Sequence, residues 1–199
     1  HKHIIFNGNG YDETWIKEAT EKRGLLNYRT TPDCMPHLLD NKNVKMLTSH
    51  KVFSEAELKS RCEIMLDNYC KTVLIEANTM IDMAKTEIAP AISAYVLELA
   101  NTASTKKAVD ESISCGYETE LLKKLSGFEE QISIYAEELE EAVMNLQDIE
   151  DIETKAYGIR DRVLNKMSEL RVVCDEAEKV TAKKYWPFPT YGELLFGVR

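Results

Sequence analysis

Glycine and proline are scarce in this chain, which has eight glycines and five prolines among its 199 residues. All-β proteins and low-complexity disordered segments use these residues heavily, so their scarcity argues against both classes. Hydrophobic residues make up 44% of the chain and charged residues 30%, which is typical of a folded protein. The length is sufficient for one large core or two small ones.

Histidine is also rare, and the four histidines are His1, His3, His37 and His50. No two of them have metal-ligand spacing on one helix. The His1-x-His3 pair could bind a metal weakly, but an incidental solvated end is the simpler interpretation. We therefore predict no metal site.

The familiar catalytic and nucleotide-binding patterns are missing as well. The sequence has no HExxH, GxSxG, Walker A or GxGxxG pattern. Residues 7–10, Asn-Gly-Asn-Gly, could offer amides to an anion, but a tight turn is the simpler interpretation. From the residues alone we predict a helical scaffold with no catalytic and no cofactor-binding residue.

Positive charge is in the minority, and the formal net charge is −9. Nucleic acids and anionic membranes require a basic face, so we expect neither as a partner. No apolar run reaches the roughly 18 residues of a membrane span, and no signal-peptide pattern opens the chain. The five cysteines are odd in number and contain no CxxC, which predicts buried thiols in a reducing compartment, the cytoplasm.

Three long helical patterns dominate what the chain does contain. The first begins at Ser54, which forms a predicted capping box with Glu57, and it continues to about Leu99. Because proline removes a bond of the helical ladder, we expect a kink or a break near Pro90. Its apolar stripe is Leu58, Cys62, Met65, Tyr69, Val73, Ala77, Met80, Ala84 and Ile88.

The second pattern covers about residues 117–146 and the third about residues 152–180. Gly127 lies inside the second pattern, where it could allow a close helix crossing at a cost of about 1 kcal/mol relative to alanine. Their stripes are Leu121, Leu125, Phe128, Ile132, Tyr135, Leu139, Ala142 and Leu146, and Ile152, Ala156, Ile159, Val163, Met167, Leu170, Val173, Ala177 and Val180. Three rods of similar length predict an all-α fold, an antiparallel bundle of three long helices over residues 53–184.

Shorter sections flank the rods. Residues 1–52 predict a small irregular section, with a strand candidate at residues 4–6 followed by short helices. Residues 185–199 form an extended aromatic tail that cannot continue a helix past its prolines. Left in solvent, its apolar side chains would promote aggregation. We therefore predict that these side chains dock or form an interface: Trp186, Phe188, Tyr191, Leu194, Leu195 and Phe196.

Several polar and aromatic residues on the rods have both a structural and a functional interpretation. The acidic residues of the second rod lack the accompanying histidine of a carboxylate metal site, which favours a solvated face. They are Glu129, Glu130, Glu137, Glu138, Glu140 and Glu141. Glu76 and Asp82 are expected to be exposed salt-bridge partners. Tyr69, Tyr95 and Tyr135 are expected to belong to the core.

Both ends of the chain resemble one family, the bacterial type III glutamine synthetases. Three sets of segments carry the resemblance: residues 4–11 with Trp15, Glu18-Ala19 and Arg23-Gly24-Leu25; Glu57-Leu58, Ser60-Arg61, Glu63-Ile64 and Ile75-Glu76-Ala77; and residues 186–196. The first set resembles the end of the catalytic domain, the second the helical region after it, and the third the C-terminal signature. Asp12 stands where we expect serine in many relatives, and either residue caps a helix. The resemblance is weakest between about residues 100 and 150.

The resemblance implies a parent enzyme of glutamine biosynthesis and nitrogen metabolism, a glutamate–ammonia ligase. Such an enzyme uses ATP and Mg or Mn, and assembles as stacked hexameric rings. Its metal-binding glutamates, ATP-contacting residues and catalytic arginines lie upstream of the segments matched here. The resemblance therefore implies a C-terminal fragment that supports structure or assembly, is inactive alone, and has the rest of the synthetase chain as its partner.

Two alternatives remain open at this point. A free-standing helical adaptor would bind a partner helix in a groove and would have a complete hydrophobic core. A small metalloenzyme bundle would hold a metal among inward-facing carboxylates.

Overall fold

The computed structural model describes residues 5, 7–189 and 191–197. The chain divides into two compact units, His1–Cys62 and Glu63–Arg199. Within the described residues the structure is helical and contains no strand, so the all-α prediction is confirmed. The predicted strand at residues 4–6 lies outside the described residues, apart from Ile5, which has no regular structure.

The first unit contains the expected short helices. Helix α1 (Glu13–Lys17) begins at Asp12, whose side chain accepts a hydrogen bond from the Thr14 amide. A π-helical turn (Glu18–Lys22) continues it, and the segment ends at Gly24, whose φ of +66° is easily adopted by glycine. Helix α2 (Thr31–Cys34), a 3₁₀ turn (Met35–Leu39) and α3 (Asn41–Ser49) follow.

Helix α4 (Glu55–Asp82) begins with the predicted capping box. The Ser54 amide donates to Glu57 Oε2 at 2.7 Å, and the Glu57 amide donates to Ser54 Oγ at 3.3 Å. Two amides that a helix start leaves unpaired are thereby satisfied. The start of the first rod is thus specified by a pair of side chains three residues apart.

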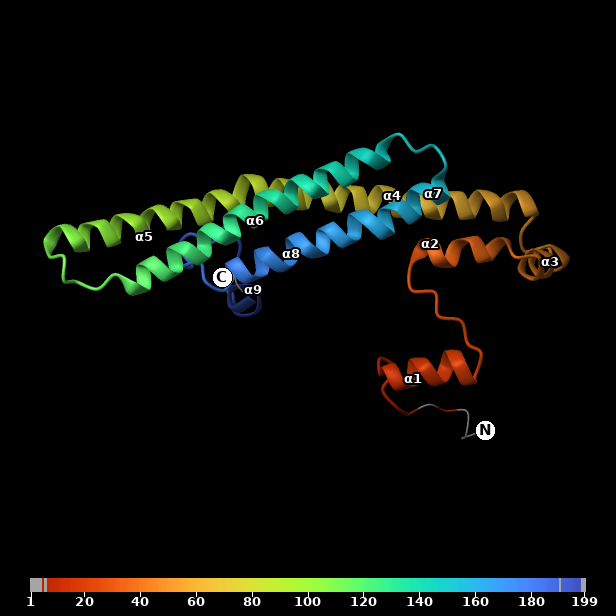
Figure 1. Cartoon of the computed structure of the whole chain (residues 1–199). Coiled ribbons are helices and arrows are strands. Elements are labelled where there is room, and N and C mark those ends of the chain that lie inside the picture. Colours follow the sequence, from red (N-terminus) through yellow and green to blue (C-terminus); the bar gives the residue numbers. More distant parts are fainter. Residues whose placement is uncertain (1–4, 6, 190, 198–199) are drawn as a thin grey trace. The chain divides into compact units, whose positions relative to one another are not determined.

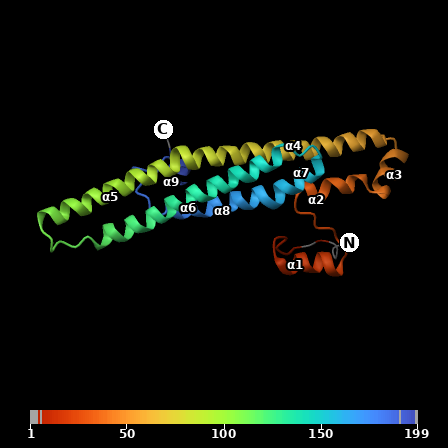
Figure 2. The same cartoon turned by 45° about the horizontal axis from the view of Figure 1, so that its top comes forward.

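The first rod passes Pro90 through a change of helix type. A π-helical turn (Met83–Ile88) separates α4 from α5 (Ala89–Val109), and Pro90, which has no N–H to donate, follows just after this turn. Figure 2 shows the rod changing direction at this place. The helix then continues to Val109, beyond residues 101–105, where the apolar pattern fades.

Helix α6 (Gly116–Gln147) returns antiparallel to α5, and the two pack along their length. After a short loop, α7 (Ile152–Gly158), a π-helical turn (Ile159–Val163) and α8 (Leu164–Glu178) form the third rod. Helix α8 packs against α6, as Figures 1 and 2 show. The tail ends in the short helix α9 (Tyr191–Phe196).

The core of the rods follows the predicted stripes with one local error. Met65 is 48% exposed, whereas its neighbour Leu66 is 2% exposed and takes the core position. On the second rod, Ala136 and Val143 join the predicted members as buried residues. The fully covered side chains of the three rods include Leu58, Ile92, Leu125, Ile132, Leu139, Leu146, Ile159, Val163 and Leu170.

Gly127 and Gly158, which lie inside the rods, have different surroundings. A Cβ added at Gly127 would meet no atom within 4 Å, so the predicted close crossing there is wrong. The close approach occurs instead at Gly158, at the end of α7, where an added Cβ would lie 2.6 Å from Leu146 Cδ2. Periodicity alone cannot distinguish these two positions, because it does not include the neighbouring helix.

Buried cysteines contribute to the same core. Cys62, Cys70, Cys115 and Cys174 are buried, whereas Cys34 is exposed. Burial raises the pKa of the Cys70 thiol, and it raises the pKa of the Cys174 thiol to about 11. None of the described helices combines the length and the apolar character that crossing a membrane requires.

Candidate functional site

The tail leaves the third rod at a cluster of polar and aromatic side chains on α5. The Tyr185 hydroxyl donates to Glu98 Oε2, and Lys184 Nζ donates to the same oxygen at 2.6 Å. The Tyr185 ring stacks on Tyr95, with 5.1 Å between ring centroids. Burial raises the pKa of Tyr95, as do the neighbouring Tyr117 and Glu98. The first residues of the tail are therefore held to α5 by side chains.

Two further aromatic residues continue the tail. Trp186 and Phe188 meet edge to face, with 6.2 Å between ring centroids, and both are half-buried. Such an arrangement is favoured by the ring quadrupoles. The two rings form one side of a groove on the second unit.

This groove, which we call the tail groove, has a volume of about 580 Å³. Its walls come from the C-terminal half of α4, the π-helical turn that follows, α8 and the tail. Its lining residues are Ile75, Glu76, Thr79, Met80, Met83, Ile88, Met167, Arg171, Cys174, Asp175, Glu178, Trp186, Phe188, Pro189 and Leu194. The groove is mainly apolar, with charged side chains among its lining.

The last part of the tail is the most exposed. Leu195 is 70% exposed and Phe196 is 80% exposed, and Leu194 lines the tail groove while remaining largely in solvent. Lys183, which lies just before the tail, forms an ion pair with Glu193 of α9 at 2.7 Å. The side chain of Tyr191 lies outside the described residues. The predicted role of these residues in docking or an interface therefore stays a prediction.

A second hollow lies beside α5, between it, the following loop and Tyr185. Its volume is about 650 Å³, and its lining residues are Ala94, Leu97, Glu98, Asn101, Thr102, Thr105, Lys106, Val109, Ile113 and Tyr185. Leu97 and Val109 are exposed, at 62% and 76%. Polar residues of the lining, among them Asn101 and Thr105, lie between these two side chains. We call this second hollow the α5 hollow.

Ion pairs between rods were missed by the sequence interpretation of the acidic residues. The acidic run of α6 is mostly exposed as predicted, but Glu138 pairs with Lys166 of α8 at 2.8 Å. Glu140 likewise pairs with Lys85 of the first rod at 2.5 Å. Hydrogen bonds from Lys166 to Glu138 and Glu169 raise the pKa of its ammonium group. These acids link helices, and a search for lysines on the neighbouring stripes could have found them.

A more buried ion pair lies next to the turn of the α5–α6 hairpin. Lys106 of α5 donates to Oε1 of Glu118, whose side chain is 8% exposed. The second oxygen, Oε2, is buried and has no hydrogen-bond partner among the described residues. Hydrogen bonding by Lys106 holds the pKa of Glu118 below its usual value of 4.5. This ion pair therefore joins α5 to α6 next to the turn of the hairpin.

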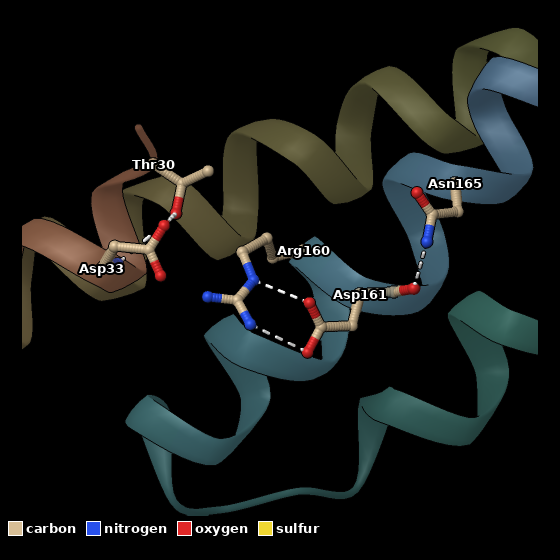
Figure 3. Close-up of polar contacts among 5 residues, drawn as sticks. All are labelled: Thr30, Asp33, Arg160, Asp161 and Asn165. Atoms are coloured by element: carbon tan, nitrogen blue, oxygen red, sulfur yellow. Dashed lines mark hydrogen bonds and ion pairs between the residues drawn. The ribbon is translucent and has the colours of Figure 1, made fainter. Parts of the chain in front are cut away.

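Polar contacts in Figure 3 have structural explanations. In the π-helical turn of the third rod, Arg160 binds Asp161 through two nitrogens, at 2.7 and 3.0 Å, and Asn165 Nδ2 donates to the Asp161 carbonyl oxygen at 2.7 Å. In the first unit, Thr30 Oγ1 donates to Asp33 Oδ2 at 2.6 Å at the start of α2. The first set supports a π turn, and the second supports a helix start.

Other candidates from the sequence also have ordinary roles. Glu76 and Asp82 are exposed, but neither forms the expected ion pair within the described part of the chain. The Asn9 side chain accepts from the Tyr11 amide at 3.0 Å, as in a turn. Tyr95 is buried, and Tyr69 and Tyr135 are half-buried.

The described residues do not assemble a metal-ligand set. No group of three His, Cys, Asp or Glu side chains among them could hold a metal ion. His37 contacts Asp40 at 3.1 Å and stacks on Tyr28, and His50 is exposed at the end of α3. His1 and His3 lie outside the described residues.

Comparison with known proteins gives one consistent family. The profile described as "Glutamine synthetase C-terminal domain" matches residues 1–107. A glutamine synthetase of Butyrivibrio fibrisolvens is 37% identical over 200 positions, covering 100% of this chain and 28% of that protein. A type-3 glutamine synthetase of Dictyostelium discoideum is 30% identical, covering 98% of this chain and 27% of that protein. A glutamine synthetase of Bacteroides fragilis is 29% identical, with 97% and 27% covered. The chain thus spans little more than a quarter of the length of these relatives.

Proposed function

This chain belongs to the glutamine synthetase C-terminal domain family, and we propose that it supports the structure and assembly of a longer enzyme rather than its chemistry. The longer enzyme would ligate ammonia to glutamate with ATP and a divalent metal in the cytoplasm. The chain spans 28% of the Butyrivibrio fibrisolvens relative, which leaves ample length elsewhere for an active site.

The α5 hollow is the observation that carries this proposal. Leu97 and Val109 expose apolar side chains in this hollow, whose lining also contains polar residues such as Asn101 and Thr105. Exposed apolar surfaces of this kind are typical of contacts with another part of a protein or with another subunit. A free-standing adaptor would also expose a groove for its partner, so the family match over residues 1–107 is what weighs against that alternative.

We propose the finer architecture and partners on the same basis. The antiparallel course of α5 and α6, with α8 beside α6, supports a bundle of three long rods with an aromatic tail. The rest of the synthetase chain, and further copies of it in stacked hexameric rings, would cover the exposed surfaces. The exposed tail side chains Leu195 and Phe196 would contribute to that docking.

ATP and Mg or Mn would bind in the rest of the longer enzyme. The described acids are engaged elsewhere or exposed: Glu138 pairs with Lys166, and Glu118 pairs with Lys106. Among the described residues these acids do not converge as a metal-ligand set. We derive no catalytic step from them.

The first test is activity of the chain by itself. The chain is incubated with ATP, Mg²⁺, glutamate and ammonia, and glutamine and phosphate are measured against a matched blank. We expect no turnover above that blank. Glutamine formation that depends on ATP and exceeds the blank would contradict the proposal.

The second test addresses assembly. Leu97→Glu places a charge in the α5 hollow, and Ser133→Glu places the same charge at an exposed position of α6 as the control. In the longer enzyme we expect Leu97→Glu to lower the molar mass of the assembly in light scattering, while Ser133→Glu leaves it unchanged. Circular dichroism of both chain variants checks that they fold. An unchanged assembly in the Leu97→Glu enzyme would count against this surface as an interface.

A further inference from the structure

The lining of the tail groove extends along both the first rod and α8. Its lining on the first rod extends from Ile75 to Ile88, which corresponds to about 20 Å at about 1.5 Å per residue. Its lining on α8 extends from Met167 to Glu178, or about 16 Å on the same basis. The rods of α4 and α8 run in the same direction (Figure 1). The groove therefore has the length of about three helical turns.

The surface of this groove is adaptable. Met80, Met83 and Met167 line it together with the rings of Trp186 and Phe188. Methionine side chains are unbranched and polarisable, so they fit apolar groups of different shapes. Aromatic residues supply large anchoring surfaces at interfaces. These residue types are suited to receiving apolar side chains from a partner.

The charged residues of the groove are mainly acidic. Glu76 and Glu178 are exposed, and neither forms an ion pair within the described residues. The Arg171 guanidinium is bound by Asp175, at 2.7 and 2.9 Å. Two carboxylates thus remain uncompensated beside an apolar surface, on a chain whose formal net charge is −9. Their field attracts cationic groups.

We propose that the tail groove binds an amphipathic helix with an apolar face flanked by lysine or arginine, supplied by another polypeptide. The length of the groove fits apolar anchors at positions i, i+3 or i+4, and i+7 of such a helix. Its methionines and aromatic rings receive the anchors, and Glu76 and Glu178 pair with the flanking cations. This site is separate from the α5 hollow, and its binding of a helix does not depend on the proposed assembly role.

The test uses the fluorescence of Trp186 in the full chain. The chain has two tryptophans, so Trp15→Phe, which lies in the first unit, makes Trp186 the single reporter. The probe is a synthetic peptide of about 18 residues, or about 27 Å of helix, with leucine at i, i+3, i+4 and i+7 and lysine beside the leucines. A second peptide has glutamate in place of every lysine.

We expect the lysine peptide to give a saturable blue shift of Trp186 emission, and the glutamate peptide to bind at least about tenfold more weakly. Met83→Lys should abolish the shift, because it places a cation among the anchors. Met144→Lys is the matched control, since Met144 is exposed on α6 and does not line the groove. It should leave binding unchanged.

A charge-reversal variant keeps the test decisive if Met83→Lys fails to fold. Glu76→Lys combined with Glu178→Lys changes two exposed residues, so it should fold normally and should prefer the glutamate peptide. Equal affinity of the unchanged chain for both peptides, or no saturable binding of either, overturns the proposal. A doubling of molar mass that blocks peptide binding would assign the groove to a second copy of this chain and overturn it as well. Displacement of a small apolar dye without any peptide binding would assign it to a small molecule, with the same consequence.

Discussion

Gly158 and Leu146 are in such close contact that there is no space for a methyl group between them. A Cβ at Gly158 would lie 2.6 Å from Leu146 Cδ2 and 3.6 Å from Cδ1. Leu146 is 1% exposed, so its side chain is enclosed by the core. The contact joins the end of α7 to the end of α6 across the loop between the second and third rods.

Replacing Gly158 by alanine should destabilise the chain. Overpacking costs about 1–3 kcal/mol, whereas the gain in helix propensity is at most about 1 kcal/mol. Gly127→Ala is the matched control, because a Cβ there meets no atom within 4 Å, and it should stabilise by roughly 0.5–1 kcal/mol. Urea unfolding of both variants gives the two free energies. Equal stabilisation by the two substitutions would show that Leu146 moves aside freely.

The stability of the α5–α6 hairpin should depend on pH through Glu118, which lies next to its turn. The pKa of Glu118 is lowered in the folded chain by its hydrogen bond from Lys106. Its stabilising contribution is therefore present above the usual pKa of 4.5 and is lost as the pH falls through the lowered folded value. We expect the melting temperature of Glu118→Gln to fall less steeply below about pH 4.5 than that of the unchanged chain.

Glu120→Gln is the control for this pH series, since Glu120 is exposed two residues further along α6. It should keep the acid dependence of the unchanged chain. The pKa of Lys106 is raised in the folded chain. At alkaline pH the same ion pair is therefore lost only when the pH rises through this raised pKa. If the melting temperatures of Glu118→Gln and of the unchanged chain fall in parallel as the pH is lowered, the pair of Lys106 and Glu118 does not contribute to the stability of the hairpin.

The rods could be predicted from the sequence because their signals are local. Ser54 and Glu57 specify the start of α4 through side chains three residues apart, and the apolar period specifies each buried face. Local signals do not decide which of several neighbouring apolar residues is the buried one. Ile64, Met65 and Leu66 are consecutive apolar residues, and only the packing of the neighbouring helices makes Leu66 the buried one.

The tail shows the same limit at the candidate site. Its aromatic content predicted docking, and Trp186 and Phe188 are half-buried against each other. The hydrogen bond from Tyr185 to Glu98 could not be predicted from apolar periodicity, because the two residues are 87 positions apart in the chain. The pairing of Glu138 with Lys166 was missed for the same reason. Contacts between rods depend on register, which a single sequence does not reveal.

Thiol reactivity should distinguish the cysteines by burial. Cys34 is exposed, whereas the other four are buried, and burial raises the pKa of Cys174 to about 11. Because the thiolate is the reacting species, we expect a maleimide at neutral pH to label Cys34 first and Cys174 far more slowly. Mass spectrometry of peptides from a time course reports each site. Labelling in denaturant is the control and should modify all five at similar rates. Rapid labelling of Cys174 in the native chain would contradict the burial of this α8 side chain.

Removing the Trp186 ring should weaken the attachment of the tail. Trp186 is half-buried, contacts Phe188 and lines the tail groove. Partial loss of its burial should cost about 1–2 kcal/mol, since full burial of a large apolar side chain contributes roughly 1.5–3 kcal/mol. We expect Trp186→Ala to lower the melting temperature or, in a longer assembly, to lower its molar mass. Differential scanning calorimetry and light scattering measure the two effects.

Phe196→Ala is the control for Trp186→Ala, because the Phe196 ring is 80% exposed. In the chain alone it should leave the melting temperature unchanged. The Tyr185→Phe variant tests the hydrogen bond to Glu98 by itself, since it removes the donating hydroxyl and keeps the ring stacked on Tyr95. It should have a smaller effect than Trp186→Ala, because Lys184 still binds the same carboxylate. If Trp186→Ala changes neither melting temperature nor molar mass, then the tail contributes nothing to the stability of the bundle or to assembly.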